Sequence, residues 1–189
     1  MRRTVLVSTL AAALIGAAAI TLPQLGLAAG EPMVGGAPMY PTKNIIENAV
    51  NSKDHTTLVA AVKAAGLVDT LSSPGPFMVF APTNEAFAML PKGTVDNLLR
   101  PENKEKLKKI LTSHVVGKAV LSDAINKMVA DDKGAHPVKT LSGAMLIAKN
   151  DNGKLTLTDE NGGVATVTIA DVKQSNGVIH VIDHVLLPK

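Results

Sequence analysis

The 189-residue chain contains no cysteine and no tryptophan, and only 2% of its residues are aromatic. Without cysteine, a disulfide framework, a thiolate metal site, a cysteine nucleophile and a lipoprotein attachment site are all excluded. The scarcity of aromatic residues argues against stacking platforms for nucleic acid and against an aromatic sugar-binding cleft. The hydrophobic share of 46% and the charged share of 19% are typical of a globular protein with an ordinary core.

The chain also lacks a strong excess of charge of either sign. Arg2 and Arg3 lie in a segment that we expect to be removed, which leaves 17 basic and 16 acidic residues, a net charge of +1. The densest basic run, residues 104–109, is interleaved with Glu105 and follows Glu102, the pattern of a solvated helix face. We therefore expect no nucleic-acid partner, since such binding needs a clustered basic field.

The first 29 residues have the layout of a secretory signal peptide. Arg2 and Arg3 precede an apolar, alanine-rich stretch over residues 5–20, and Pro23 and a run of small residues follow. Two alternatives stay open: an uncleaved membrane anchor, because the charge-free stretch is long enough to span a bilayer, and export by the twin-arginine route. The favoured prediction is a signal peptide at residues 1–29, a secreted or periplasmic mature protein, and no membrane span after cleavage.

The rest of the chain divides into a short leader and one domain. Residues 30–41 are rich in glycine and proline and poor in apolar residues, so we expect a flexible leader. Residues 42–189 are enough for a single domain with a sizeable core.

Apolar spacing predicts helices in the first half of the domain and strands in the second. Helical stripes occur around residues 45–50, 58–65 (ended by Gly66), 84–90, 101–114 and 122–130, with one buried strand at residues 77–81. Turn signals then separate short alternating segments, with Asp151-Asn152-Gly153 typical of a hairpin. Helices followed by an antiparallel meander indicate an α+β fold. Neither of the common glycine-rich phosphate-binding motifs is present, and we expect no cofactor.

Three stretches together resemble the fasciclin-type (fasciclin I) domain family. Residues 77–87 (FMVFAPTNEAF) resemble its first signature block, residues 111–116 (LTSHVV) its middle Tyr-His segment, and residues 176–188 (NGVIHVIDHVLLP) its closing block. The order and spacing agree over residues 42–189. The resemblance implies helices packed on an antiparallel, partly wedge-like β sandwich. It also implies a non-enzymatic module that adheres to a cell surface, matrix, polysaccharide or another protein.

Most residues of these blocks also have a structural interpretation. Pro82 stops a strand, Thr83 or Asn84 can cap the next helix, and Phe87 faces inward. Asn176-Gly177 is expected to supply a left-handed turn before the last strand.

His114 is the most informative single residue. The helical period places it on the buried stripe, and an unpaired buried imidazole costs about 1–3 kcal/mol, so a partner is expected. Asp183 or a strand carbonyl is our candidate for that partner. The resemblance associates this segment with adhesion to receptors, which makes Ser113, His114 and Val115 candidate contacts. Ser113, however, stands where the family has tyrosine, so the aromatic anchor is missing.

Two further combinations of residues are weaker candidates for a metal site or a catalytic site. His180 and His184 share one face if both lie on a strand, but about 13 Å then separates them, too far for a two-histidine metal site. A Ser113-His114-Asp183 triad can be written down, but neighbouring positions on a helix do not face each other.

Three functions compete at this point. The leading hypothesis is an exported, non-enzymatic binding module. The alternative is a carrier of an apolar small molecule such as a carotenoid or lipid, which the resemblance implies because some fasciclin-type proteins bind carotenoids. The seven methionines of the chain would suit such a ligand, since they offer adaptable apolar contacts. An exported enzyme is the third.

Overall fold

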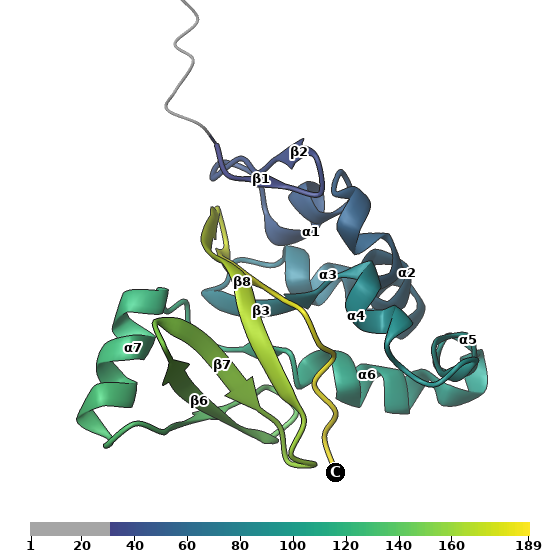
Figure 1. The fold of residues 1–189 in the computed structure, drawn as a ribbon. Coiled ribbons are helices and arrows are strands. Elements are labelled where there is room, and N and C mark those ends of the chain that lie inside the picture. The colour runs from purple at the N-terminus through teal and green to yellow at the C-terminus, as the bar shows by residue number, and fades with distance from the viewer. Residues whose placement is uncertain (1–30) are drawn as a thin grey trace, which may run out of the picture.

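The computed structural model describes residues 31–189 (Figure 1). The signal peptide predicted for residues 1–29 lies outside the described residues. The helices are α1 (Ile45–Ala49), α2 (Thr56–Ala65), α3 (Val68–Ser72), α4 (Asn84–Ala88), α5 (Thr94–Leu98), α6 (Lys104–Thr112) and α7 (Ser122–Asp131), with 3-10 turns η1 (Lys53–His55) and η2 (Pro101–Asn103). Helices α1 to α6 gather on one side of the sheet, and α7 lies on the other (Figure 1).

Seven strands form one mostly antiparallel sheet. They are β3 (Phe77–Pro82), β4 (Val115–Val116), β5 (His136–Lys139), β6 (Met145–Asp151), β7 (Lys154–Thr158), β8 (Val164–Gln174) and β9 (Gly177–Ile182). Their order is β4-β3-β9-β8-β7-β6-β5. The predicted α+β class is confirmed, but β3 and β9 run parallel, with Phe77 opposite Gly177. The expected antiparallel arrangement holds for the other pairs of this sheet; the β3–β9 pair differs because β9 returns to the centre of the sheet beside a strand from the helical half.

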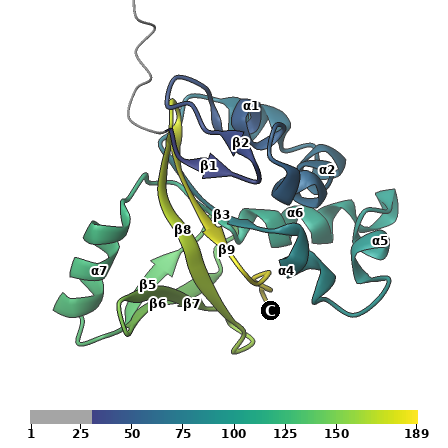
Figure 2. The same cartoon turned by 45° about the horizontal axis from the view of Figure 1, so that its top comes forward.

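The long strand β8 joins two parts of this sheet (Figure 2). Its first residues pair with β7, whereas its later residues pair with β9. The register shifts between Val167 and Ile169 and again between Ile169 and Val172. Such irregularities bend a strand and increase its twist. The predicted sandwich is therefore one sheet that bends at β8, with its two edge strands, β4 and β5, brought toward each other.

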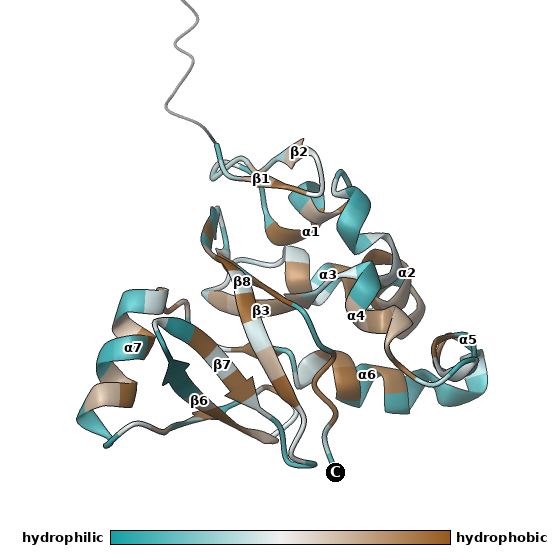
Figure 3. Cartoon of the chain, viewed as in Figure 1, coloured by the Kyte–Doolittle hydropathy of each residue, from teal (hydrophilic) through white to brown (hydrophobic). Residues whose placement is uncertain are grey.

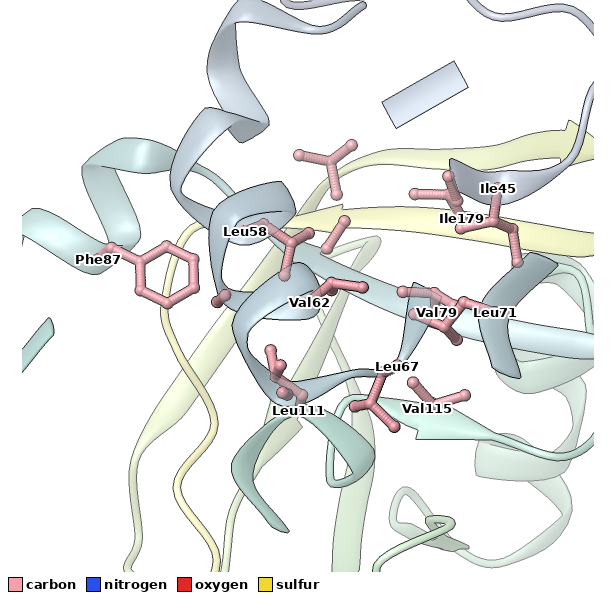
Figure 4. Close-up of a cluster of buried hydrophobic side chains, with 14 of the residues drawn as sticks. Ile45, Leu58, Val62, Leu67, Leu71, Val79, Phe87, Leu111, Val115 and Ile179 are labelled. Atoms are coloured by element: carbon pink, nitrogen blue, oxygen red, sulfur yellow. The ribbon is translucent and has the colours of Figure 1, made fainter. Parts of the chain in front are cut away.

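Two hydrophobic clusters fill the two halves. The first, the helical core, lies between α1–α6 and the sheet and includes Phe87, which faces inward as predicted (Figure 4). The second, the sheet core, lies inside the bend under α7 and is centred on Phe80, Leu157 and Ile182. Hydrophobic and hydrophilic segments alternate around α6 and α7, as expected of amphipathic helices that bury one face (Figure 3).

The segment predicted to be a flexible leader is ordered where the structure describes it. Strands β1 (Met33–Val34) and β2 (Ala37–Pro38) form a hairpin, and Val34 and Met39 are buried in the helical core. The Lys53 amide donates to the Gly35 carbonyl at 3.1 Å. Gly35 and Gly36 both have positive φ, so these glycines make a tight turn where the composition had indicated mobility.

Several local signals were interpreted correctly and one was not. Gly66, at φ +70°, ends α2, and Asn152-Gly153, both with positive φ, close the β6–β7 hairpin. The helix expected around residues 122–130 would ordinarily be capped by one of its own first residues, Ser122 or Asp123. Instead Asp171 of β8 accepts hydrogen bonds from the Ser122 amide at 2.7 Å and from its hydroxyl at 2.5 Å. No helix within residues 31–189 combines the length and the apolarity needed to cross a membrane.

Candidate functional site

The first signature block forms a corner between β3 and the helices. Thr83 caps α4, its hydroxyl accepting from the Ala86 amide at 3.3 Å. Asn84 caps a different helix: its side-chain oxygen accepts from the Thr57 amide at 3.0 Å, at the start of α2. Its amide nitrogen donates to the Lys53 carbonyl at 2.8 Å. The sequence offered Thr83 and Asn84 as alternatives, and the structure uses both, one for each helix.

Asn176 links three elements that lie far apart in the sequence. Its side-chain oxygen accepts from the Ile45 amide at 3.0 Å, at the start of α1. Its amide nitrogen donates to the carbonyls of Leu71 and Ser73, at 2.8 and 2.9 Å, at the end of α3. One buried side chain therefore satisfies three backbone groups that the ends of short helices leave open.

Gly177 has a different role from the predicted one. Neither Asn176 nor Gly177 has positive φ, so the expected left-handed turn is wrong. A Cβ at Gly177 would instead lie against the Phe77 carbonyl oxygen, well inside van der Waals contact. A Cβ at Gly75 would likewise lie against the Asn176 carbonyl oxygen, at the start of the β3–β9 pair. Glycine is required here because two backbones approach closely.

His114 is buried, as its spacing predicted, and both of its ring nitrogens are occupied. Nδ1–H donates to the Ile110 carbonyl at 2.8 Å, and Nε2 accepts from the Leu186 amide at 2.9 Å. Neither Asp183 nor a strand carbonyl is the partner; Asp183 instead accepts from the Thr166 amide at 2.7 Å. Burial lowers the pKa of His114 to about 4, opposed by the Ile110 carbonyl and more weakly by Asp159. The ring is neutral and joins α6 to the C-terminal tail.

The candidate partner contacts around His114 are not accessible. Ser113, His114 and Val115 are each only 1–2% exposed. The Ser113 hydroxyl donates to the Lys109 carbonyl at 2.8 Å and lies 2.8 Å from the Ser142 hydroxyl. These side chains leave no surface for a receptor, and Ser113, His114 and Asp183 do not form a triad.

His180 is also buried and bonded at both nitrogens. Nε2–H donates to the Val120 carbonyl at 3.1 Å, and Nδ1 accepts from the Asp171 amide at 3.3 Å. Burial lowers the pKa of His180, opposed by the Val120 carbonyl and by Asp171. Because Asp171 also caps α7, these two residues hold the start of that helix against β8 and β9.

His184 lies beyond the end of β9, so the expectation that it shares a strand face with His180 was wrong. Its ring pairs with the Asp183 carboxylate at 2.8 Å on the surface. Desolvation raises the pKa of Asp183, but the hydrogen bonds from His184 and Thr166 and the charge of His184 together outweigh it, so the pKa is lowered. Across residues 31–189, no three histidine, aspartate or glutamate side chains cluster in a way that could hold a metal ion.

Three structurally important residues carried no clear signal in the sequence. Buried Asn48 exchanges two hydrogen bonds with the backbone of Tyr40 and also bonds Gln174 of β8. Asp159 accepts from the Gly163 amide in its own turn and from the Leu187 amide in the tail. His55 bonds the Ser52 hydroxyl through Nδ1, whereas its buried Nε2 has no hydrogen-bond partner. Of the three, Asp159 lies nearest to a recognisable pattern, because the turn signal Glu160-Asn161-Gly162-Gly163 follows it directly.

Residues 53–188 match the family model described as the Fasciclin domain. The chain belongs to the fasciclin domain family. Protein sll1483 of Synechocystis sp. is 47% identical over 177 residues, which cover 86% of this chain and 91% of that protein. Transforming growth factor-beta-induced protein ig-h3 of Sus scrofa is 39% identical over 131 residues, 69% of this chain and 17% of that protein. Immunogenic protein MPB70 of Mycobacterium bovis is 37% identical, with 74% and 66% covered.

A solved structure shares the architecture of this fasciclin domain. The FAS1 domain pair from the insect cell adhesion molecule Fasciclin I aligns with a TM-score of 0.67 and 19% identity. The alignment covers 77% of this chain and 51% of the insect chain, so this chain spans about half the length of that domain pair. At this identity the likeness shows the fold, which agrees with the fold that the resemblance implied.

Proposed function

We propose that this fasciclin domain is an exported, non-enzymatic binding module that attaches to a cell surface, matrix or another protein. The observation that carries the proposal is how the signature residues are used. Four signature residues use their side chains to bond the backbone of the domain itself: Asn84, His114, Asn176 and His180. The motifs therefore build a scaffold, and recognition falls to the surface around it.

The relatives support this proposal in a general way. The insect protein that shares the fold is a cell adhesion molecule, and periostin of Homo sapiens is 28% identical over 144 residues. Export is supported by the secretory layout of residues 1–29. Export is tested by sequencing the N-terminus of the mature protein from cell fractions. A cytosolic protein that retains Met1 would overturn it.

Binding is tested with the purified mature protein offered to intact cells, envelope polysaccharide and candidate surface proteins. We expect saturable binding to one of these three, with no turnover of ester, phosphate or glycoside substrates. Protein unfolded by heat is the matched control, since it keeps composition and charge and loses the surface. Absence of binding in all three assays, or binding equal to that of the unfolded control, would contradict the proposal.

The alternative, a carrier of an apolar small molecule such as a carotenoid or lipid, gets no support from the packing of the helical core. The two cavities under α1 and α2, both lined by residues such as Ile45, Leu58 and Val79, measure about 30 Å³ each. A space of that size holds about one water molecule. A larger apolar space lies elsewhere, beside α7.

A further inference from the structure

An open cleft of about 470 Å³ lies between the two edges of the sheet. One wall follows β4 into Gly117 and Lys118, the opposite wall is β5, and α7 contributes Ile125 and Met128. Helix α7 stands beside this end of the sheet (Figure 2). The cleft volume falls within the range of about 300–1,000 Å³ found for small-molecule sites.

The local sequence explains why the sheet does not close here. Backbone bonds join the two edges at one end only, where the Leu141 amide donates to the Val115 carbonyl at 2.7 Å and the Ser142 amide to the Thr112 carbonyl at 3.3 Å. Strand β4 is two residues long, and β5 contains Pro137, which has no N–H to donate to another strand. The gap between the strands is therefore built into the chain.

The apolar lining of the cleft is aliphatic with thioether groups, and the one aromatic ring on its wall is the imidazole of His136. Its apolar members come from β3, β4, β5, α7 and the segment before α7: Met78, Val116, Val120, Ile125, Met128 and Val138. Aliphatic and methionine side chains adapt to a flexible alkyl chain and offer no stacking surface for a planar ring.

The rim of the cleft is cationic. Lys118 and Lys139 both line it and are exposed, and neither forms an ion pair within residues 31–189. The nearby Asp132 carboxylate pairs with the imidazole of His136 at 2.5 Å. Two lysines without acidic partners at the mouth of an apolar cleft complement a ligand with an anionic head and an apolar tail.

We propose that this cleft binds a long-chain carboxylate. The alkyl chain lies along Met78, Ile125 and Val138, and the carboxylate faces Lys118 and Lys139. This proposal does not rest on the proposed partner binding, so either function can fail without the other.

The test uses sodium dodecanoate, below its micelle concentration, with the full mature protein. We expect one molecule to bind per chain, with NMR shifts grouped at residues 116–128 and 136–140. Dodecyltrimethylammonium, which has the same chain and the opposite charge, should bind at least tenfold more weakly.

Two charge-reversal variants separate the rim from charge in general. The double variant Lys118→Glu with Lys139→Glu changes exposed residues and should weaken dodecanoate binding at least tenfold. The matched control, Lys106→Glu with Lys149→Glu, makes the same change in net charge outside the cleft and should alter binding less than twofold. Equal weakening in both variants, equal binding of the cationic amphiphile, or no binding of dodecanoate at millimolar concentration would overturn the proposal.

Discussion

The two halves of the domain satisfy their backbone hydrogen-bonding groups in different ways. In the sheet half, strands β5 to β8 pair with their neighbours in sequence, so the ladder satisfies most backbone groups locally. In the helical half, most helices are only five residues long, too short to be stable alone. Helices α1 and α4 have local caps, Asn44 and Thr83, but asparagines from distant segments add bonds at the starts of α1 and α2 and at the end of α3. The signature residues are concentrated where local structure is weakest.

The substitution expected to have the largest effect on this contrast is Asn176→Ala. It leaves the Ile45 amide and the Leu71 and Ser73 carbonyls without partners, and we expect the free energy of unfolding to fall by about 3–4 kcal/mol. Urea denaturation measures the change. The control is Asn161→Ala, whose exposed side-chain amide makes one bond, to the Leu187 carbonyl; it should cost less than about 1 kcal/mol. Similar losses for the two variants would mean that Asn176 has no special role.

The next test is acid titration, because it acts on both halves through buried histidines. The folded pKa of His114 is about 4, below the ordinary value of 6.5, so the unfolded state binds more protons between these values. Stability contributed by the neutral ring is complete above pH 6.5 and is lost as the pH falls toward 4. The full loss is about 3 kcal/mol for His114. The lowered pKa values of His180 and His55 act in the same direction.

Urea denaturation at pH 7.5 and at pH 4.5 measures this loss. His114→Gln should reduce stability at pH 7.5 yet show a smaller difference between the two pH values than the wild type. A wild-type protein equally stable at both pH values would contradict the buried, neutral placement of His114.

The smallest expected effect concerns the outer face of α7. Lys127 and Asp131 form an ion pair at 2.9 Å, with side chains 76% and 64% exposed. Lys127→Ala should change the free energy of unfolding by less than about 0.5 kcal/mol, because solvent and salt screen such pairs. A loss above 1 kcal/mol would show that α7 depends on its surface as well as on the Asp171 cap.

The sequence predicted features that depend on local spacing and failed where distant segments meet. The helical period placed His114 in the interior, but nothing near it indicates that the Leu186 amide is its partner. The α7 cap comes from Asp171, a residue with φ +60° in the middle of β8, 49 positions from Ser122. Gly177 was correctly singled out for the wrong reason, because close approach to β3 is a property of the assembled sheet.

For the candidate site, too, the sequence predicted local patterns and failed where distant segments meet. The signature blocks could be identified from residue patterns, yet their structural use became visible only once β3 and β9 were paired. The cleft beside α7 was not predicted, since its walls are separated by about twenty residues and its rim consists of two unremarkable lysines. The composition of residues 30–41 predicted a flexible leader for a similar reason. The segment has few apolar residues, but two of them, Val34 and Met39, pack into the helical core formed by the rest of the chain.

The bond between Ile45 and Asn176 spans 131 positions and so constrains the order of folding. A chain delivered from its N-terminus, by a ribosome or through a translocation channel, presents its helices long before residue 176 arrives to complete them. Until then the Ile45 amide and the Leu71 and Ser73 carbonyls lack their side-chain partner, and helices of five residues are too short to be stable alone. The helical half of the domain is therefore completed only when the final strand reaches the centre of the sheet.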